Sequence, residues 1–312
     1  MSPFSKSIVS ESELMIVPAK DAGVPREERN MTISIIGIIG AGVMGGGIAQ
    51  FFAERGARVL LWDADPNALW RGVGAVYERL KKSAEKGSLT EEQVQETMSR
   101  LGGVEVLAAF RPADLVIEAI IEDASAKKAL LVKLSEAVSD SAIIGSNTSS
   151  LSVTGLAAAC PHPERFLGIH FFNPPTKLEL VEVVPASQTA PQTVETVQGF
   201  LREYGKTPVT VKDSPGFIVN RLLLLMINEA ARMVDEGVAT AADIDTAMRL
   251  GALHPAGPLA VADLIGLDIC EHILEVLRDT LGESSYAPAG GITERVKEGK
   301  LGRKSGEGFF TR

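Results

Sequence analysis

The sequence predicts an α/β domain followed by an all-helical domain. In the first two thirds of the chain, short apolar runs rich in Ile and Val alternate with longer stretches of helical periodicity, as expected for a parallel sheet covered by helices. A glycine-rich turn follows the first of these runs. From Phe217 onward no strand alternation recurs, and we predict helices at about 217–236, 240–249, 259–281 and 292–299.

The 312 residues divide into three segments. We expect a loose N-terminal tail over residues 1–31, the α/β domain over 32–212 and the helical domain over 213–312. The tail has neither a signal-peptide nor a transit-peptide pattern, and Met31 is a second candidate for the natural start because Thr32 opens the first strand. The segment DSP over 213–215 begins the helical domain, with Pro near the first turn of a helix.

The glycine-rich turn reads GxGxxG between a strand at 32–39 and a helix. Gly40 permits the tight turn, Gly42 lets the backbone approach a pyrophosphate, and Gly45 lets helix and strand pack closely. The helix N-terminus adds a preference for negative charge. This context predicts a Rossmann-type dinucleotide-binding domain whose cofactor contacts include Gly40, Gly42, Val43, Met44 and Gly45.

A second strand at 58–62 ends in Asp63, about 20 residues beyond the glycines. The Asp63 carboxylate can accept hydrogen bonds from the adenosine ribose hydroxyls and would repel a 2′-phosphate, so NAD is favoured over NADP as the cofactor. The alternative is that Asp63 only begins the turn at the end of its strand.

The remaining elements of the first domain continue the same pattern. Helices are predicted at 67–86, 90–101 and 127–138, the second with a Thr90/Gln93 capping pattern, and strands at 113–120, 142–145, 167–172, 177–184 and 208–211. Two strands are followed by polar residues, Glu122 and Asp123 in one case and SNTSS over 146–150 in the other. Because ligands bind beyond the carboxyl ends of such strands, both groups are candidates for the cleft. The hydroxyls of 146–150 could instead cap a helix that starts near Leu151.

His170 and Glu182 lie where packing alone would not place polar side chains. The two-residue period of the strand at 177–184 puts Glu182 on the more apolar face, where a carboxylate needs a partner. His170 precedes a Pro-Pro turn that could fold the Glu182 strand back beside it. In such a pair the carboxylate fixes the imidazole tautomer and leaves the other ring nitrogen as a general base near neutral pH. The alternative is a buried His with a backbone partner and a Glu that reaches the sheet edge.

Composition excludes several classes of function. The net charge of −9 argues against nucleic acid or an anionic membrane as the main partner, and no apolar window reaches the length of a transmembrane span. The two cysteines, Cys160 and Cys270, form no CxxC and fit a reducing, cytoplasmic location. The four histidines show no metal-ligand spacing, and we predict no metal.

Taken together, these features resemble the short-chain L-3-hydroxyacyl-CoA dehydrogenase family, most closely its bacterial 3-hydroxybutyryl-CoA dehydrogenases. The matching segments are IIGAGVMGGGIAQ (38–50), ADLVIEAIIED (113–123), SNTSSLS (146–152), HFFNPP (170–175), LVEVV (180–184), DSPGFIVNR (213–221), HPAGPLAVADLIGLD (254–268) and LGRKSGEGFF (301–310). They span nearly everything after Met31.

The resemblance implies reversible, NAD-dependent oxidation of a short (S)-3-hydroxyacyl-CoA to the 3-ketoacyl-CoA, a step of fatty acid metabolism. It implies that His170 is the catalytic base and Glu182 its orienting partner, and that Ser149 and Asn220 hydrogen-bond the acyl group. It also implies that Glu122, Lys127, Asn173 and Lys304 lie near the cofactor, and Lys82 and Lys86 near the CoA nucleotide. The helical domain would close over the cleft and carry a homodimer interface.

The sequence departs from the family pattern after Tyr286, where an Arg-Pro followed by Pro-Leu-Leu is replaced by APAGGI over 287–292. We expect a looser segment there and a missing arginine contact. Three alternatives to the acyl-CoA function stay open: a dehydrogenase of a free hydroxy acid such as gulonate, a non-catalytic NAD-binding protein, and a lysine-dependent β-hydroxyacid dehydrogenase. The intact His170, Glu182, Ser149 and Asn220 argue against the second, and HFFNPP and PGFIVNR against the third.

Overall fold

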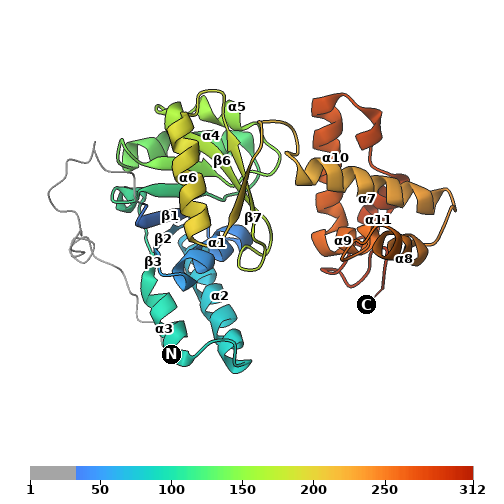
Figure 1. The fold of residues 1–312 in the computed structure, drawn as a ribbon, viewed down its shortest axis with the longest axis horizontal. Coiled ribbons are helices and arrows are strands. Elements are labelled where there is room, and N and C mark those ends of the chain that lie inside the picture. The colour runs from blue at the N-terminus through green and yellow to red at the C-terminus, as the bar shows by residue number, and fades with distance from the viewer. Residues whose placement is uncertain (1–32, 312) are drawn as a thin grey trace. The chain divides into compact units, whose positions relative to one another are not determined.

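The structure is a computed structural model that describes residues 33–311. The predicted tail over 1–31 and the candidate start at Met31 lie outside the described residues. The chain forms two compact units, a first that ends at Asp213 and a second over Ser214–Arg312 (Figure 1). Each unit is described by itself.

The first unit is built on an eight-stranded sheet of order β3-β2-β1-β4-β5-β6-β7-β8. Every neighbouring pair is parallel except β6 and β7, which are antiparallel. The strands are β1 (Ile35–Ile39), β2 (Arg58–Trp62), β3 (Leu101–Gly103), β4 (Leu115–Glu118), β5 (Ile143–Ser146), β6 (Phe166–Phe171), β7 (Leu180–Pro185) and β8 (Thr207–Thr210). The strand order reverses between β1 and β4, which is where doubly wound sheets bind their ligands.

The helices of the first unit connect these strands. They are α1 (Val43–Glu54), α2 (Pro66–Glu85), α3 (Glu91–Arg100), α4 (Ala124–Ala137), α5 (Val153–Ala157) and α6 (Pro191–Glu203), with short 3₁₀ turns at Leu107–Phe110 and Pro163–Arg165. The Thr90/Gln93 capping box opens α3 as predicted, because the Thr90 hydroxyl accepts from the Gln93 N–H and the Gln93 side chain accepts from the Thr90 N–H. Strand β3 and helix α6 were not predicted.

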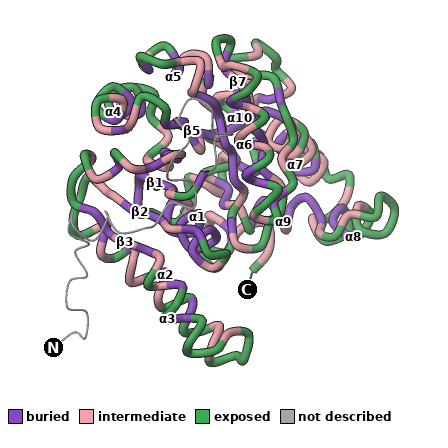
Figure 2. Tube along the Cα trace, turned by 60° about the vertical axis from the view of Figure 1, so that its left-hand side comes forward, coloured by how far each residue is buried: buried purple, intermediate pink, exposed green. Residues whose placement is uncertain are grey.

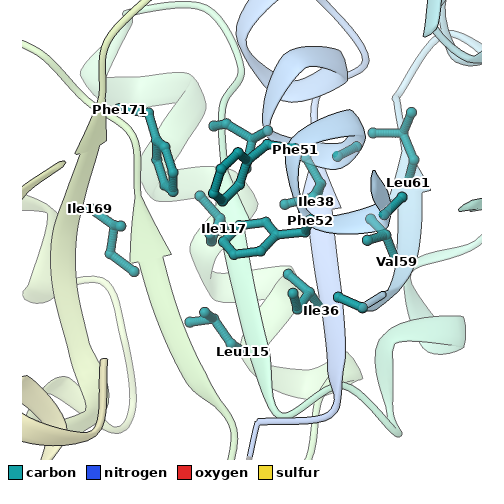
Figure 3. Close-up of a cluster of buried hydrophobic side chains, with 14 of the residues drawn as sticks. Ile36, Ile38, Phe51, Phe52, Val59, Leu61, Leu115, Ile117, Ile169 and Phe171 are labelled. Atoms are coloured by element: carbon teal, nitrogen blue, oxygen red, sulfur yellow. The ribbon is translucent and has the colours of Figure 1, made fainter. Parts of the chain in front are cut away.

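The core of the first unit lies where α1 packs on the sheet. Phe51 and Phe52 project from α1 toward Ile38, Ile117 and Phe171 of the strands (Figure 3). Phe52 stacks on Phe200 of α6, with ring centroids 5.2 Å apart. Buried residues run along the strands while exposed ones dominate the tip of the α2–α3 hairpin (Figure 2). This packing makes the sheet and α1 a rigid support for side chains at the strand ends.

The second unit is all-helical over its described residues, as the loss of strand alternation predicts. It contains α7 (Val219–Asp235), α8 (Ala241–Gly251), α9 (Pro258–Ile265), α10 (Leu267–Leu281), a 3₁₀ turn (Ser284–Tyr286) and α11 (Gly290–Lys297). The single helix predicted at 259–281 is wrong. Gly266 has a φ of 107°, outside the helical region, and it separates α9 from α10.

The segment over 287–291 is also different from expectation. Asn228 donates to the carbonyl oxygens of Ser285 and Ala287, and its own amide oxygen accepts from the Ala289 N–H. Arg232 of α7 donates to the same two carbonyls. It is not the arginine that the sequence lacks after Tyr286, so the missing contact of that arginine stays a prediction. The expected looseness is therefore wrong, because side chains of α7 satisfy the backbone of this segment.

Candidate functional site

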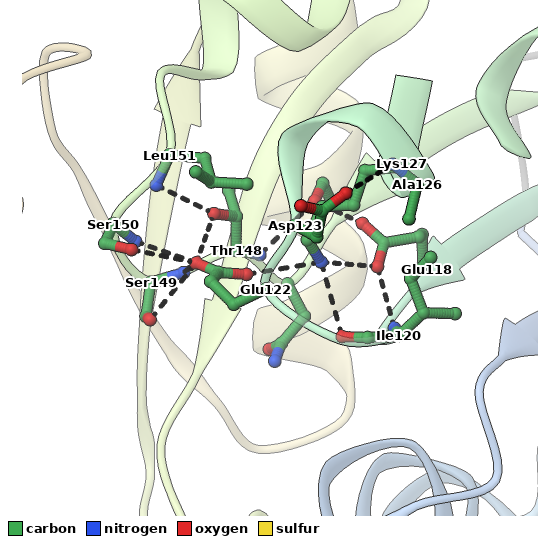
Figure 4. Close-up of polar contacts among 12 residues, drawn as sticks. Glu118, Ile120, Glu122, Asp123, Ala126, Lys127, Thr148, Ser149, Ser150 and Leu151 are labelled. Carbon is green, nitrogen blue, oxygen red and sulfur yellow. Dashed lines mark hydrogen bonds and ion pairs between the residues drawn. The ribbon is translucent and has the colours of Figure 1, made fainter. Parts of the chain in front are cut away.

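A buried carboxylate, Glu118, ends strand β4 and is fully covered. Its Oε1 accepts from the Lys127 Nζ at 2.5 Å and from the Ile120 N–H at 2.7 Å (Figure 4). Its Oε2 accepts from the Ser146 hydroxyl at 2.5 Å. Ser146 ends the neighbouring strand β5. Because a buried charge must be paired and hydrogen-bonded, this arrangement fixes the carboxyl ends of β4 and β5 to each other.

A second carboxylate, Glu122, binds the loop that follows β5. Its Oε1 accepts from the Thr148 hydroxyl and from the N–H groups of Ser149 and Ser150 at 2.6–3.0 Å (Figure 4). Its Oε2 lies 3.3 Å from the Lys127 Nζ. Burial alone would raise the pKa of Glu122, but the Lys127 charge and these hydrogen bonds hold its pKa below the usual value. Glu122 is thus ionised near neutral pH and sets the position of Ser149.

The turn between β1 and α1 has the shape that a dinucleotide phosphate needs. A Cβ on Gly40, whose φ is 97°, would lie 2.5 Å from the Ala119 carbonyl oxygen, and a Cβ on Gly45 would lie 1.7 Å from the Gly40 oxygen. Both positions therefore require glycine. Nothing lies within 4 Å of a Cβ built on Gly42, the N-cap of α1, and no side chain caps this helix. The open backbone at the helix N-terminus fits a pyrophosphate.

Asp63 follows β2 beside this turn. Its Oδ2 accepts from the Ala41 N–H at 2.8 Å and its Oδ1 from the Asp65 N–H at 3.0 Å. These bonds fix the carboxylate next to the glycine turn, and each oxygen keeps a second lone pair for a ribose hydroxyl. The residues present therefore fit NAD. Val43, which is exposed, and Met44 form the first turn of α1.

His170 and Glu182 form a buried pair. They are directly opposite in the antiparallel β6–β7 ladder, and the His170 Nδ1 lies 2.8 Å from the Glu182 Oε2. The side chains are 7% and 1% exposed. Strand β6 is tied to the end of β5, because the Phe171 N–H donates to the Asn147 side chain at 2.8 Å. The pair therefore sits near the same carboxyl-end edge as Glu122 and Ser149.

The periodicity that suggested this pair is only partly correct. Strand β7 begins at Leu180, and the residues before it form a turn in which Lys177 and Leu178 are exposed. Val181 and Val183 are both fully buried, so the face opposite Glu182 is apolar as well. The alternation failed because an interior strand is covered on both faces.

Other predicted site residues of the first unit lie on its surface or near the strand ends. Ser149 is half-buried in the loop held by Glu122, and Asn173 is exposed just after β6. Lys127 is 1% exposed, and its ammonium contacts the carboxylates of Glu118 and Glu122. Lys82 and Lys86 are exposed at the C-terminal end of α2.

Two predicted residues belong to the second unit. Asn220 lies in the first turn of α7 and is half-buried. Lys304 lies in the loop after α11, and its Nζ contacts both oxygens of Asp268 at 2.5 and 2.6 Å. The buried carboxylate of Asp263 stabilises the end of that loop, because it accepts hydrogen bonds from the Phe309 and Phe310 N–H groups at 2.9 Å.

Sequence analysis missed Glu118 and Lys206 as residues of interest. Glu118 was counted as one member of an apolar strand, although a lone acid at the end of such a strand is itself a signal of a buried network. Lys206 lies between α6 and β8, and its ammonium is buried against a loop some thirty positions earlier in the chain. No local pattern marks it.

Within residues 33–311, no group of three His, Cys, Asp or Glu side chains has an arrangement that could hold a metal ion. In the same range, no helix combines the length and the apolar character that crossing a membrane requires.

Comparison with known proteins identifies the family. The family model "3-hydroxyacyl-CoA dehydrogenase, NAD binding domain" matches residues 35–214, and the model for the C-terminal domain of the same family matches residues 216–312. A probable 3-hydroxybutyryl-CoA dehydrogenase of Deinococcus radiodurans is 44% identical over 274 residues, which cover 88% of this chain and 98% of the relative. The 3-hydroxybutyryl-CoA dehydrogenase of Bradyrhizobium diazoefficiens is 42% identical over 278 residues, or 89% of this chain and 95% of the relative.

Among solved structures, the (S)-3-hydroxybutyryl-CoA dehydrogenase from Ralstonia eutropha aligns with a TM-score of 0.85 and 42% identity, covering 90% of this chain and 99% of that one. Sequence and structure matches thus extend over both units. The chain therefore belongs to the 3-hydroxyacyl-CoA dehydrogenase family, and it is an NAD-dependent oxidoreductase with a Rossmann-type domain followed by a helical C-terminal domain.

Proposed function

We propose that this protein interconverts a short-chain (S)-3-hydroxyacyl-CoA, such as 3-hydroxybutyryl-CoA, and the corresponding 3-ketoacyl-CoA, with His170 as the general base and Glu182 as its orienting partner. The observation that carries the proposal is the contact of 2.8 Å between the His170 Nδ1 and the Glu182 Oε2. It supports a tautomer in which Nδ1 carries the proton donated to Glu182, so that Nε2 is the nitrogen that exchanges a proton with the substrate hydroxyl.

His170 and Glu182 act in both directions of the reaction. During oxidation His170 takes the proton of the 3-hydroxyl group, and Glu182 stabilises the imidazolium that forms. During reduction His170 returns this proton to the 3-ketone oxygen. The bound NAD supplies the hydride acceptor, and Gly40, Gly42, Gly45 and Asp63 are the residues that would hold it.

The remaining assignments follow the family pattern. Ser149, positioned by Glu122, and Asn220 of the second unit are candidate hydrogen-bond donors to the acyl group. Val43, Met44, Glu122, Lys127, Asn173 and Lys304 are candidates for the surroundings of the cofactor. Lys82 and Lys86 are exposed cations suited to the nucleotide of CoA.

Two broader properties are also proposals. A homodimer formed through the second unit is an expectation from the family, and sedimentation of the purified protein at several concentrations tests it. A cytoplasmic location rests on Cys160 and Cys270, which are buried and free in the structure. Burial raises the pKa of both thiols to about 12, so neither is a reactive thiolate.

The decisive experiment follows NADH oxidation with acetoacetyl-CoA and with free acetoacetate, for the wild type and for His170→Ala. We expect turnover of the thioester, and a loss of about 10²–10⁴-fold in kcat in the variant because it lacks a positioned base. NADH affinity, measured by fluorescence titration, is expected to be unchanged because the glycine turn is intact.

The alternatives give different results. Turnover of the free acid alone would identify a hydroxy-acid dehydrogenase instead. Tight NADH binding without turnover of either compound would identify a non-catalytic NAD-binding protein. Full activity of His170→Ala would remove the assignment of the base while leaving the substrate class.

A further inference from the structure

Lys206 is a buried cation that the proposed chemistry does not use. It lies between α6 and β8 and is 5% exposed. Its Nζ donates to the carbonyl oxygen of Pro175 at 2.6 Å and to that of Leu178 at 2.5 Å. The same atom lies 3.9 Å from the ring centroid of Phe51 and 5.8 Å from that of Phe171. The ammonium thus joins one loop to two aromatic rings of the core.

The loop held by Lys206 is the connection between the two strands of the proposed catalytic pair. It runs over residues 172–179, from the end of β6, which carries His170, to the start of β7, which carries Glu182. Pro175 also packs closely on α1, since a Cβ on Gly47 would lie 2.9 Å from the proline ring. The loop is thereby held at Pro175 and at Leu178.

Burying this ammonium is unfavourable by itself. Desolvation and the neighbouring charge of Arg55 lower the pKa of Lys206 to about 8, against a smaller opposing effect of Glu179. Charge-assisted hydrogen bonds to the carbonyl oxygens and cation–π contacts with the rings offset part of the desolvation free energy of the ammonium. A methionine or leucine would fill the same space without desolvating a charge, so the site is better explained by what the ammonium holds than by packing.

We propose that Lys206 is a positioning residue for the His170–Glu182 pair: its ammonium fixes the β6–β7 loop and so maintains the register and distance at which the Glu182 carboxylate meets the His170 imidazole. This inference rests on the proposed function for its kinetic consequence. Its structural consequence, the geometry of the pair, does not depend on which substrate the enzyme takes.

The kinetic test compares Lys206→Met, Lys206→Arg and Lys177→Met with acetoacetyl-CoA and NADH. Lys177 is the matched control, because it is an exposed lysine of the same loop. We expect Lys206→Met to lower kcat about 10- to 100-fold, as small misplacements of catalytic groups do, with little change in the KM for NADH. Lys206→Arg restores most of this loss, since it keeps the charge and the donors, and Lys177→Met behaves as wild type.

A second readout is independent of turnover. The hydrogen bond between the His170 Nδ1 and the Glu182 carboxylate is followed by the NMR signal of the Nδ1 proton in the wild type and in Lys206→Met, and the signal is identified by its absence in His170→Ala. Loosening this contact weakens the hydrogen bond, so the signal moves upfield and the proton exchanges faster with water. We expect both changes in Lys206→Met and neither in Lys177→Met.

The outcomes separate the two proposals. A wild type without turnover of acetoacetyl-CoA contradicts the proposed function, and the NMR signal of the His170 Nδ1 proton then decides on Lys206. An unchanged NMR signal of the His170 Nδ1 proton in Lys206→Met, or a kcat equal to that of Lys177→Met, overturns the positioning role. If Lys206→Met does not fold, Lys206→Gln takes its place in both measurements and is compared with Lys206→Arg in the same way.

Discussion

Glu118 and Glu182 are both buried glutamates of one sheet, but their partners differ: Glu118 is paired with a lysine and Glu182 with a histidine. Glu118 meets the ammonium of Lys127 and accepts two further hydrogen bonds, from the Ile120 N–H and the Ser146 hydroxyl. Glu182 meets the imidazole of His170, a ring whose nitrogens can donate or accept a proton. A buried carboxylate held by a fixed charge is a structural anchor, whereas one opposite a titratable ring can support proton transfer.

The difference also appears in what each carboxylate joins. Glu118 links the ends of two parallel strands and, through Lys127, reaches Glu122 and the Ser149 loop. Glu182 lies opposite His170 in a single antiparallel ladder. We therefore expect changes at the first cluster to lower stability and changes at the second to lower activity.

The largest expected effect on stability comes from Lys127→Met. It leaves the Glu118 carboxyl group buried without its cation, and breaking a buried pair in this way costs about 3–5 kcal/mol of the free energy of unfolding. Urea denaturation measures this loss. The double variant Glu118→Gln/Lys127→Met removes both charges and is expected to be more stable than Lys127→Met alone. A double variant that is no more stable would show that Glu118 is not an anchor of the proposed kind.

The largest expected effect on activity beyond His170 itself comes from Glu182→Gln. The amide cannot stabilise the imidazolium, so kcat falls by about 10²-fold, the lower end of what a positioned base contributes. The free energy of unfolding changes less than in Lys127→Met. Glu179→Gln is the control, because Glu179 is an exposed acid just before the same strand. Equal kinetics of the two variants would contradict the distinction between the clusters.

A smaller loss of stability is expected for Ser146→Ala. It removes one hydrogen bond to the Glu118 carboxylate, and an unmade bond to a buried charged group costs about 1–3 kcal/mol. Thermal and urea unfolding of this variant are compared with those of Ser141→Ala, an exposed serine that precedes the same strand. If the free energy of unfolding of Ser146→Ala equals that of the wild type, water replaces the hydroxyl, and the network around Glu118 is more accessible to solvent than the distances indicate.

The smallest effect concerns the acid sensitivity of the Glu122 contact. The pKa of Glu122 is lower in the folded chain than the ordinary glutamate value of 4.5, so the unfolded chain binds more protons in the range just below that value. The stability that Glu122 contributes is therefore complete above about pH 4.5 and is lost as the pH falls through its folded pKa. Glu122→Gln keeps an acceptor but has no such dependence. Parallel loss of stability in both proteins on acidification would contradict this linkage.

Much of the first unit could be predicted because its signals are local. The glycines between β1 and α1, the acid after β2 and the Thr90/Gln93 cap each depend on a few neighbouring residues. The proximity of His170 and Glu182 could be inferred because one short hairpin joins their strands. Gly266 shows where local signals fail. Apolar periodicity continues through Gly266, so the sequence predicted one helix. In the structure the positive φ of Gly266 ends α9 before α10 begins.

By itself, the sequence determined the fold class, the cofactor and the pair of residues at the centre of the proposed chemistry, since periodicity, turn residues and short spacings depend only on neighbours along the chain. Tertiary structure decided which buried charges meet. Glu118 reaches Ser146 only because β4 and β5 pair in register, and Lys206 reaches Pro175 only because β8 lies beside β7. Desolvation makes such distant pairings obligatory once they are buried, but the partner that satisfies each charge is set by strand order and packing.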